Sequence, residues 1–306
     1  MRFAISVTFC IAYGRRIENL GDDFVVANQG IERTFLKFAM PGQLVDSFPF
    51  LLHLPRPLQW FRYEVDRQRK YATSVYTDAL NTVKKQIAQD TAQKSMATLA
   101  LQKQREFEMD DHEIAYALSA PWSAGVLTTV ATIEVAILAM LHDPSVMRKA
   151  QAEIDRVVGR GRIPDFSDID ALPYLQALIK ETLRWRPIAP IGFAHCVTED
   201  DVYNGMFIPK GSTVFANISA ITSDPKLFPE PEQFKPERFL NTDDPRLTNY
   251  TLSFGFGRRV CPGLHIAQQS VFIVLVRMLW AFDMLPALDS DGKPDIPPSD
   301  DFTSGI

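Results

Sequence analysis

The sequence has few cysteines, no excess of positive charge and no long apolar start. Its 306 residues include three cysteines, Cys10, Cys196 and Cys261, which lie far apart in the chain. An odd number at such spacing predicts neither a disulfide framework nor a zinc site, and it favours a reducing environment. Asp and Glu outnumber Lys and Arg by 37 to 32, so the basic balance typical of nucleic-acid binders is missing. We therefore expect no nucleic-acid partner.

The apolar stretch at residues 1–13 does not predict a membrane-spanning segment. It provides about a dozen mostly apolar residues, whereas a bilayer needs a helix of about 20. Arg15 and Arg16 stand where a signal peptide would carry its small-residue cleavage site. A buried helix is favoured over a secretion signal, and we expect no transmembrane anchor in this chain.

Apolar periodicity predicts a chain that is mainly α-helical with a small β portion. Hydrophobic residues make up 46% and charged residues 23% of the sequence, which is ordinary for a globular protein. Helical spacing occurs in residues 24–38, 60–93, 111–142, 145–158, 172–185 and 262–283. The segment 111–142 is apolar on nearly all sides, which predicts a long buried central helix with a bend at Pro121. We expect one compact domain over residues 1–306.

The remaining segments predict loops and a hairpin. Residues 41–57 are rich in proline and aromatic residues, which favours a loop. Residues 197–215 alternate between apolar and polar side chains, and Asn204-Gly205 is a strong signal for a hairpin turn. Several prolines within residues 222–240 exclude both a helix and a central strand there.

A run of polar and basic residues, Arg67-Gln68-Arg69-Lys70, lies within the predicted helix 60–93. Such a run could contact a phosphate or a membrane surface. A solvated helix face is the commoner explanation of a charge run, and both interpretations stay open.

The segment FGFGRRVCPG, residues 254–263, carries the chemistry. Cys261 lies in a loop between Gly257 and Gly263, directly before a long helix, and glycines permit close approach of a flat ligand. Backbone N–H groups at the helix start and two arginines favour a thiolate, which can act as a nucleophile or a metal ligand. A nucleophile would need a nearby base, which the sequence does not identify. A lone cysteine is also often a small core residue.

The loop has the defining residues of the haem-loop signature of the cytochrome P-450 family: Phe254, Gly257, Arg259, Cys261 and Gly263. Three further segments match that family in the same order along the chain, namely Ala124-Gly125-x-x-Thr128-Thr129, Glu181-x-x-Arg184 and Pro236-Glu237-Arg238-Phe239. The chain resembles cytochromes P-450 over nearly its whole length, and fungal microsomal members most closely.

This resemblance implies haem b as the cofactor. Cys261 would be the proximal thiolate ligand of the haem iron, and electron donation from a thiolate favours O–O cleavage. Arg259 would bind a haem propionate and His195 would bind another, while Phe254 would protect the thiolate. Thr128 would hold the distal water or oxygen through its hydroxyl.

The resemblance also implies that Glu181, Arg184 and Arg238 form a structural network that supports the haem loop. Spacing of three places Glu181 and Arg184 on one helix face, where they would otherwise be an ordinary surface pair. Other interpretations stay open for two site residues: Thr128 could bond its own helix backbone, and the neighbours of His195 suggest a buried strand. Cys10 and Cys196 are expected to be core residues.

The sequence also departs from the family pattern. Leu127 stands where the family has an acid before the oxygen-segment threonine, and leucine cannot carry a proton. The family's membrane anchor, N-terminal sheet region and final hairpin have no counterpart, so we expect a cytochrome P-450 fold that is truncated at both ends.

The resemblance implies a monooxygenase that inserts one atom of dioxygen into a small apolar organic substrate. Electrons would come from NADPH through a partner of the NADPH-cytochrome P-450 reductase type. The expected substrate lining consists of Ala117, Trp122, Val126 and Leu127. The alternatives are a haem-thiolate isomerase, dehydratase or peroxygenase, which suits Leu127, or an inactive haem-protein fragment. The family implies the cytoplasmic face of the endoplasmic reticulum; without an anchor, the chain would be cytoplasmic or of unknown location.

Overall fold

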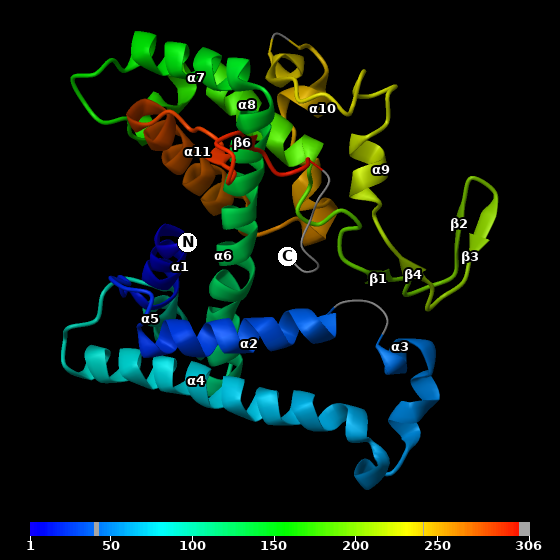
Figure 1. The fold of residues 1–306 in the computed structure, drawn as a ribbon. Coiled ribbons are helices and arrows are strands. Elements are labelled where there is room, and N and C mark those ends of the chain that lie inside the picture. Colours follow the sequence, from blue (N-terminus) through cyan, green and yellow to red (C-terminus); the bar gives the residue numbers. More distant parts are fainter. Residues whose placement is uncertain (40–42, 241, 300–306) are drawn as a thin grey trace. The chain divides into compact units, whose positions relative to one another are not determined.

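The computed structural model describes residues 1–39, 43–240 and 242–299 (Figure 1). The described residues form mostly helices, with short strands only in the second half, so the expected fold class is confirmed. Two compact units are present, the first over Met1–Val130 and the second beginning at Ala131. Helix α6 (Asp111–His142) contributes residues to both units, and its bounds agree with the predicted central helix. The prediction of a single domain is not tested by this division.

The first unit is built from helices around an aromatic core. Its helices are α1 (Arg2–Tyr13), α2 (Asp23–Ala39), α3 (Leu44–Ser47), α4 (Tyr63–Ala88), α5 (Met96–Gln102) and the start of α6. The ring of Phe9 packs edge-on against the rings of Trp122 and Phe24, with 5.2 Å and 4.5 Å between ring centroids. Trp122 and Val126 are both buried in this core. The prediction that they line a substrate pocket is therefore wrong, because their face of α6 is covered by α1 and α2.

Segment 41–57 is less irregular than predicted. Within its described part, α3 is followed by the 3₁₀ turns η1 (Pro49–His53) and η2 (Arg56–Leu58). Proline occupies one of the first two positions of both turns, where its fixed φ and missing N–H suit a helical start. The predicted helix 60–93 is shorter than expected, since a 3₁₀ turn, η3 (Trp60–Arg62), precedes α4.

The second unit has its own core, formed by packed helices and the segments between them. Its helices are the end of α6, α7 (Pro144–Val157), α8 (Pro173–Trp185), α9 (Ile218–Thr222), α10 (Pro245–Thr248) and α11 (Leu264–Ala281). Leu178 of α8 and Leu275 of α11 are completely buried in this core. The backbone N–H groups of Tyr174 and Leu175 donate to the carboxylate of Glu153 at 2.9 and 3.0 Å, so α7 caps the start of α8.

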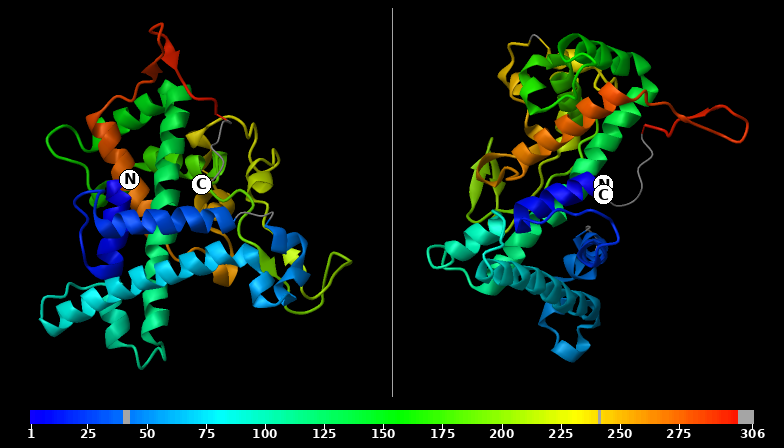
Figure 2. Two further views of the ribbon diagram at one scale, coloured as in Figure 1. Left: turned by 60° about the horizontal axis from the view of Figure 1, so that its bottom comes forward. Right: turned by 90° about the vertical axis from the view of Figure 1, so that its left-hand side faces the viewer.

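Three antiparallel strand pairs complete the described part of the second unit. They are β1 (His195–Cys196) with β4 (Thr213–Val214), β2 (Asp201–Tyr203) with β3 (Met206–Ile208), and β5 (Ala287–Leu288) with β6 (Pro294–Asp295). Asn204 and Gly205 join β2 to β3 with φ values of 50° and 79°, which confirms the predicted turn. Figure 2 shows the β5–β6 hairpin extending away from α11. The sequence reasoning did not predict this hairpin.

Two described helices, α6 and α11, are long and apolar enough to cross a membrane by length and composition alone. Helices in the core of soluble proteins meet the same criteria; α6 contributes side chains to both cores, and α11 contributes side chains to the core of the second unit. The sequence prediction considered only the start of the chain, where α1 has 12 residues.

Candidate functional site

The loop of residues 252–263 holds Cys261 by backbone hydrogen bonds at the start of α11. The N–H of Cys261 donates to the carbonyl of Phe254 at 2.9 Å, which closes the loop. The carbonyl of Cys261 accepts from the N–H of Leu264 at 3.3 Å, at the first residue of α11. The thiol is half-buried and makes no disulfide. The loop therefore presents one sulfur atom at the start of a helix.

Two glycines give the loop its shape. Gly255 and Gly257 have φ values of 83° and 57°, which side-chain-bearing residues rarely adopt. Gly263 has negative φ, and a Cβ there would lie 3.7 Å from the sulfur of Cys261, an ordinary contact. Gly255 is a site residue that the sequence reasoning missed, although it lies inside the matched segment.

The loop also fits a flat apolar group that carries carboxylates. Arg259 is exposed and makes no ion pair within the described residues, so its guanidinium is available to an anionic ligand. Apolar side chains of the loop and of the start of α11 are exposed, namely Phe256, Val260 and Ile266. Exposed apolar surface beside a thiol and a cation suits a haem, whose ring is apolar and whose propionates are negative. The residues present therefore fit the cofactor that the resemblance implies.

His195 begins strand β1, where it pairs in register with Val214. The strand is exposed, so the suggestion of a buried strand at His195 is wrong. The reason is that β1 pairs only with β4 among the described strands, and both of its residues stay exposed there. Phe193, two residues earlier, is 81% exposed. Exposure leaves the ring nitrogens of His195 accessible to an anionic ligand.

The structure brings Glu181, Arg184 and Arg238 together in one network. Two guanidinium nitrogens of Arg184 donate to the two carboxylate oxygens of Glu181, at 2.7 and 2.8 Å. Arg238 donates to the same carboxylate at 3.1 Å, and so does the backbone N–H of Lys235 at 2.8 Å. Glu181 and Arg184 are almost fully buried, which excludes the interpretation as an ordinary surface pair.

The two arginines of this network also bind the proline-rich segment that precedes η5 (Pro236–Phe239). Arg238 donates to the carbonyls of Pro229, Glu230 and Gln233 at 2.8–3.2 Å. Arg184 donates to the carbonyl of Gln233 at 3.3 Å. A segment without helix or strand thus has its carbonyl groups satisfied by guanidinium groups.

A further hydrogen bond joins this region to the loop. The hydroxyl of Ser253 donates to the carbonyl of Leu183, near the end of α8, at 2.8 Å. Ser253 is a second residue that the sequence reasoning missed, and a serine beside a phenylalanine gives no local signal for it. The helix that carries Glu181 and Arg184 therefore also fixes the segment before Phe254.

Thr128 lies in α6, within the first unit, and its side chain is exposed. Its hydroxyl donates to the carbonyl of Ala124, one turn earlier, at 2.6 Å. This is the bond within its own helix that the sequence left open as an alternative. Ala117 is exposed and Leu127 is half-buried, in contrast to Trp122 and Val126.

The other two cysteines are not core residues. Cys10 and Cys196 are both exposed, so that prediction is wrong for each of them. Cys10 lies on the outer face of α1, and Cys196 lies in the uncovered strand β1. Their exposure makes both cysteines suitable controls for experiments on Cys261.

Comparison with known proteins identifies a single family. The model of the family Cytochrome P-450 matches residues 1–304. The chain is 37% identical over 278 residues to Cytochrome P-450 monooxygenase 58 of Postia placenta, with 88% of this chain and 53% of that protein covered. It is 38% identical over 275 residues to Cytochrome P-450 monooxygenase claR of Ampulloclitocybe clavipes, covering 87% of this chain and 50% of that protein.

A solved structure agrees with this result. A zebra fish cytochrome P-450 with abiraterone matches all of this chain with a TM-score of 0.74 and 27% identity, and the match covers 66% of that protein. The chain spans about half the length of the curated fungal relatives that it matches. Sequence, fold and the cysteine loop lead to the same conclusion, which is that this chain belongs to the cytochrome P-450 family.

Proposed function

We propose that this chain is the haem-thiolate part of a monooxygenase that oxidises a small apolar organic substrate. The observation that carries the proposal is the loop 252–263, which holds the half-buried Cys261, exposed apolar side chains and Arg259, an arginine with no ion pair among the described residues. The relatives named above are monooxygenases, which supports the same reaction class. Electrons would come from NADPH through a reductase partner of the cytochrome P-450 type.

In this proposal, three residues would bind the haem. Bound haem supplies the iron at which dioxygen chemistry occurs, and a thiolate ligand favours O–O cleavage. Cys261 would provide that ligand, Arg259 would hold one propionate, and His195 would hold another. The backbone bond from Cys261 to Phe254 holds the loop that carries the sulfur, and the Phe254 side chain would shield the thiolate.

Thr128 would hold a water or oxygen through its hydroxyl in this proposal. Because its hydroxyl proton is donated to Ala124, its oxygen acts as an acceptor in the arrangement seen here. A role in proton transfer would require this hydroxyl to rotate away from the Ala124 carbonyl. By the family resemblance, we also propose the cytoplasmic face of the endoplasmic reticulum membrane as the location of the protein.

The decisive experiment is the absorption spectrum of the reduced, haem-loaded chain with carbon monoxide. We expect the red-shifted Soret band of a thiolate ligand for the natural sequence. Cys261→Ser should abolish this band, whereas Cys196→Ser and Cys10→Ser should retain it. A thiolate-type band that persists in Cys261→Ser, or the absence of any haem spectrum, would overturn the proposal.

A haem-thiolate isomerase, dehydratase or peroxygenase is the second candidate, and Leu127 favours it. Because leucine carries no proton, a reaction that needs no proton relay to dioxygen suits this position. Product formation with peroxide but none with reductase and NADPH would favour the second candidate. A gain of reductase-driven turnover in Leu127→Asp would instead favour a monooxygenase with a weakened proton supply.

A further inference from the structure

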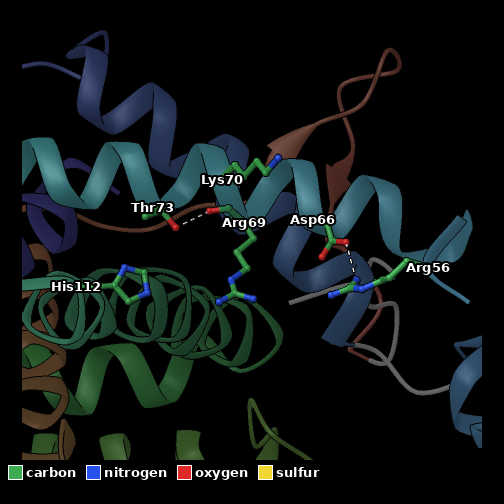
Figure 3. Close-up of a pocket in the computed structure, with 6 residues that line it drawn as sticks. All are labelled: Arg56, Asp66, Arg69, Lys70, Thr73 and His112. Atoms are coloured by element: carbon green, nitrogen blue, oxygen red, sulfur yellow. Dashed lines mark hydrogen bonds and ion pairs between the residues drawn. The ribbon is translucent and has the colours of Figure 1, made fainter. Parts of the chain in front are cut away.

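The first unit contains a cleft of 490 Å³ that the proposed haem chemistry does not use. The cleft is formed by α4, the turn η2 and the first turn of α6, as Figure 3 shows. Its lining consists of Arg56, Asp66, Arg69, Lys70, Thr73 and His112. It thus includes two residues of the basic run at 67–70, which the sequence left open between a phosphate contact and a solvated face.

The cleft has an excess of positive charge although the whole chain has a net charge of −5. Among the described residues, Asp66 is the only carboxylate in the lining, and it forms an ion pair with Arg56 at 3.2 Å. Arg69 and Lys70 make no ion pair with any residue in the described ranges of the chain. Two cations therefore line the cleft with no ion-pair partner among the described residues, which favours an anionic ligand.

The hydroxyl of Thr73 joins the Arg69 turn of α4 to α6. The hydroxyl of Thr73 donates to the backbone carbonyl of Arg69 at 2.8 Å and lies 2.7 Å from the hydroxyl of Tyr116 on α6. The ring of Tyr116 in turn packs against His112, with 4.8 Å between the ring centroids. In Figure 3 the guanidinium of Arg69 extends toward the space between His112 and the Arg56–Asp66 pair. The two helices that carry Thr73 and His112 are therefore joined beside the cleft.

We infer that this cleft binds a phosphate group. The guanidinium fork of Arg69 can donate to two phosphate oxygens at once. Lys70 adds a second positive charge, so the cleft favours a phosphate over a halide, which has a single charge and no oxygen pair. The volume lies within the range of small-molecule sites and exceeds the needs of one phosphate. All the lining residues carry polar or charged groups. The part of the ligand that enters the cleft beside the phosphate should therefore be hydrophilic, as in a diphosphate or a phosphorylated head group.

The test is calorimetric titration of the full chain with inorganic pyrophosphate at constant ionic strength in chloride. We expect saturable binding that Arg69→Gln weakens at least tenfold, because a hydrogen-bonded charge is lost. The matched control is Arg67→Gln, which removes the same charge two residues away on α4, outside the lining, and should change affinity less than twofold. Asp66→Asn should tighten binding, because it removes the one repelling carboxylate and releases Arg56.

A second set of measurements identifies the source of the phosphate. Phosphatidylcholine vesicles, with and without phosphatidic acid, are tested for sedimentation of the natural chain and of Arg69→Gln. Binding to phosphatidic acid that depends on Arg69 and is displaced by pyrophosphate indicates a lipid head group. Pyrophosphate binding without such vesicle binding indicates a soluble phosphate compound.

The inference is overturned if the natural chain binds neither probe. It is also overturned if Arg67→Gln and Arg69→Gln weaken binding equally, since that result indicates nonspecific attraction to a charged helix. Circular dichroism checks the folding of each variant, and Asp66→Asn tests the site even if Arg69→Gln does not fold. None of these measurements needs haem, so their results test the phosphate site independently of the proposed function.

Discussion

The carboxyl group of Glu32 shows how strongly burial acts on a single residue. Glu32 lies on α2, is 7% exposed, and makes no ion pair among the described residues. Burial raises its pKa from 4.5 to about 7. The same burial raises the pKa of Tyr76 on α4, and the nearby Glu32 charge adds to that rise. A charged carboxylate in this core is unfavourable, so the neutral acid is the form that suits the fold.

The stability of the protein should therefore depend on pH through Glu32. Between pH 4.5 and 7 the folded state binds more protons at Glu32 than the unfolded state does. The contribution of this residue to stability is thus present at low pH and is lost as the pH rises through about 7. Relative to the natural chain, Glu32→Gln should gain up to about 3 kcal/mol of unfolding free energy by pH 8 and little at pH 4.

Denaturant unfolding of the two proteins across this pH range measures the effect. The control is Glu18→Gln, which removes an exposed carboxyl from the same unit. A difference between Glu32→Gln and the natural chain that stays constant with pH would contradict the prediction.

At the scale of elements, the network around Glu181 joins α8 to η5 and to the irregular segment before it. Eight hydrogen bonds from two arginines and one backbone N–H reach Glu181 and carbonyls of that segment, at 2.7–3.3 Å. The segment has no ladder of its own, so its position depends on these side chains. The network around Glu181 stabilises the fold only because each buried charge in it has a partner.

Glu181→Gln should therefore be severely destabilising. The substitution leaves the guanidinium of Arg184, which is 1% exposed, without a compensating charge. We expect a loss of about 3–5 kcal/mol in the free energy of unfolding, measured by urea denaturation. The matched control is Glu237→Gln in the same unit, whose pair with Lys149 is exposed and should contribute less than about 1 kcal/mol. Equal losses in both variants would show that the buried network has no special importance.

At the scale of the whole molecule, the core helices of the second unit bury many more side chains than its hairpins do. Helices α8 and α11 provide completely buried residues to the core of the second unit. The β2–β3 hairpin of the same unit has no buried residue. Local opening requires little free energy where few apolar contacts are lost, so stability is unequal within this unit.

Amide hydrogen exchange should show this difference. We expect the amides of Leu178 and Leu275 to exchange only through the largest opening of the unit, and those of Val202 and Phe207 to exchange orders of magnitude faster. Mass spectrometry of peptides from these segments measures the rates under native conditions. Similar protection of the hairpin and of α8 would contradict the prediction and would indicate a cover for the hairpin.

The sequence by itself determined the features that depend on neighbouring residues in the chain. The long apolar run specifies a buried helix, and α6 extends over Asp111–His142 with Pro121 inside it. Asn204-Gly205 fixes a hairpin turn because both residues tolerate positive φ. The glycines and the cysteine of segment 254–263 likewise determine a tight loop before a helix.

Only the tertiary structure decided which faces of these elements are covered. Trp122 and Val126 are buried because α1 and α2 pack on their side of α6, and the apolar run gives no sign of which side that is. Cys10 and Cys196 are exposed because no described element covers them, which composition does not determine. The cleft at Arg69 exists because α4 and the neighbouring turn η2 meet α6, which begins further along the chain. Local patterns specify backbone conformation, whereas burial depends on partners far away in sequence, and these partners decide where a site can form.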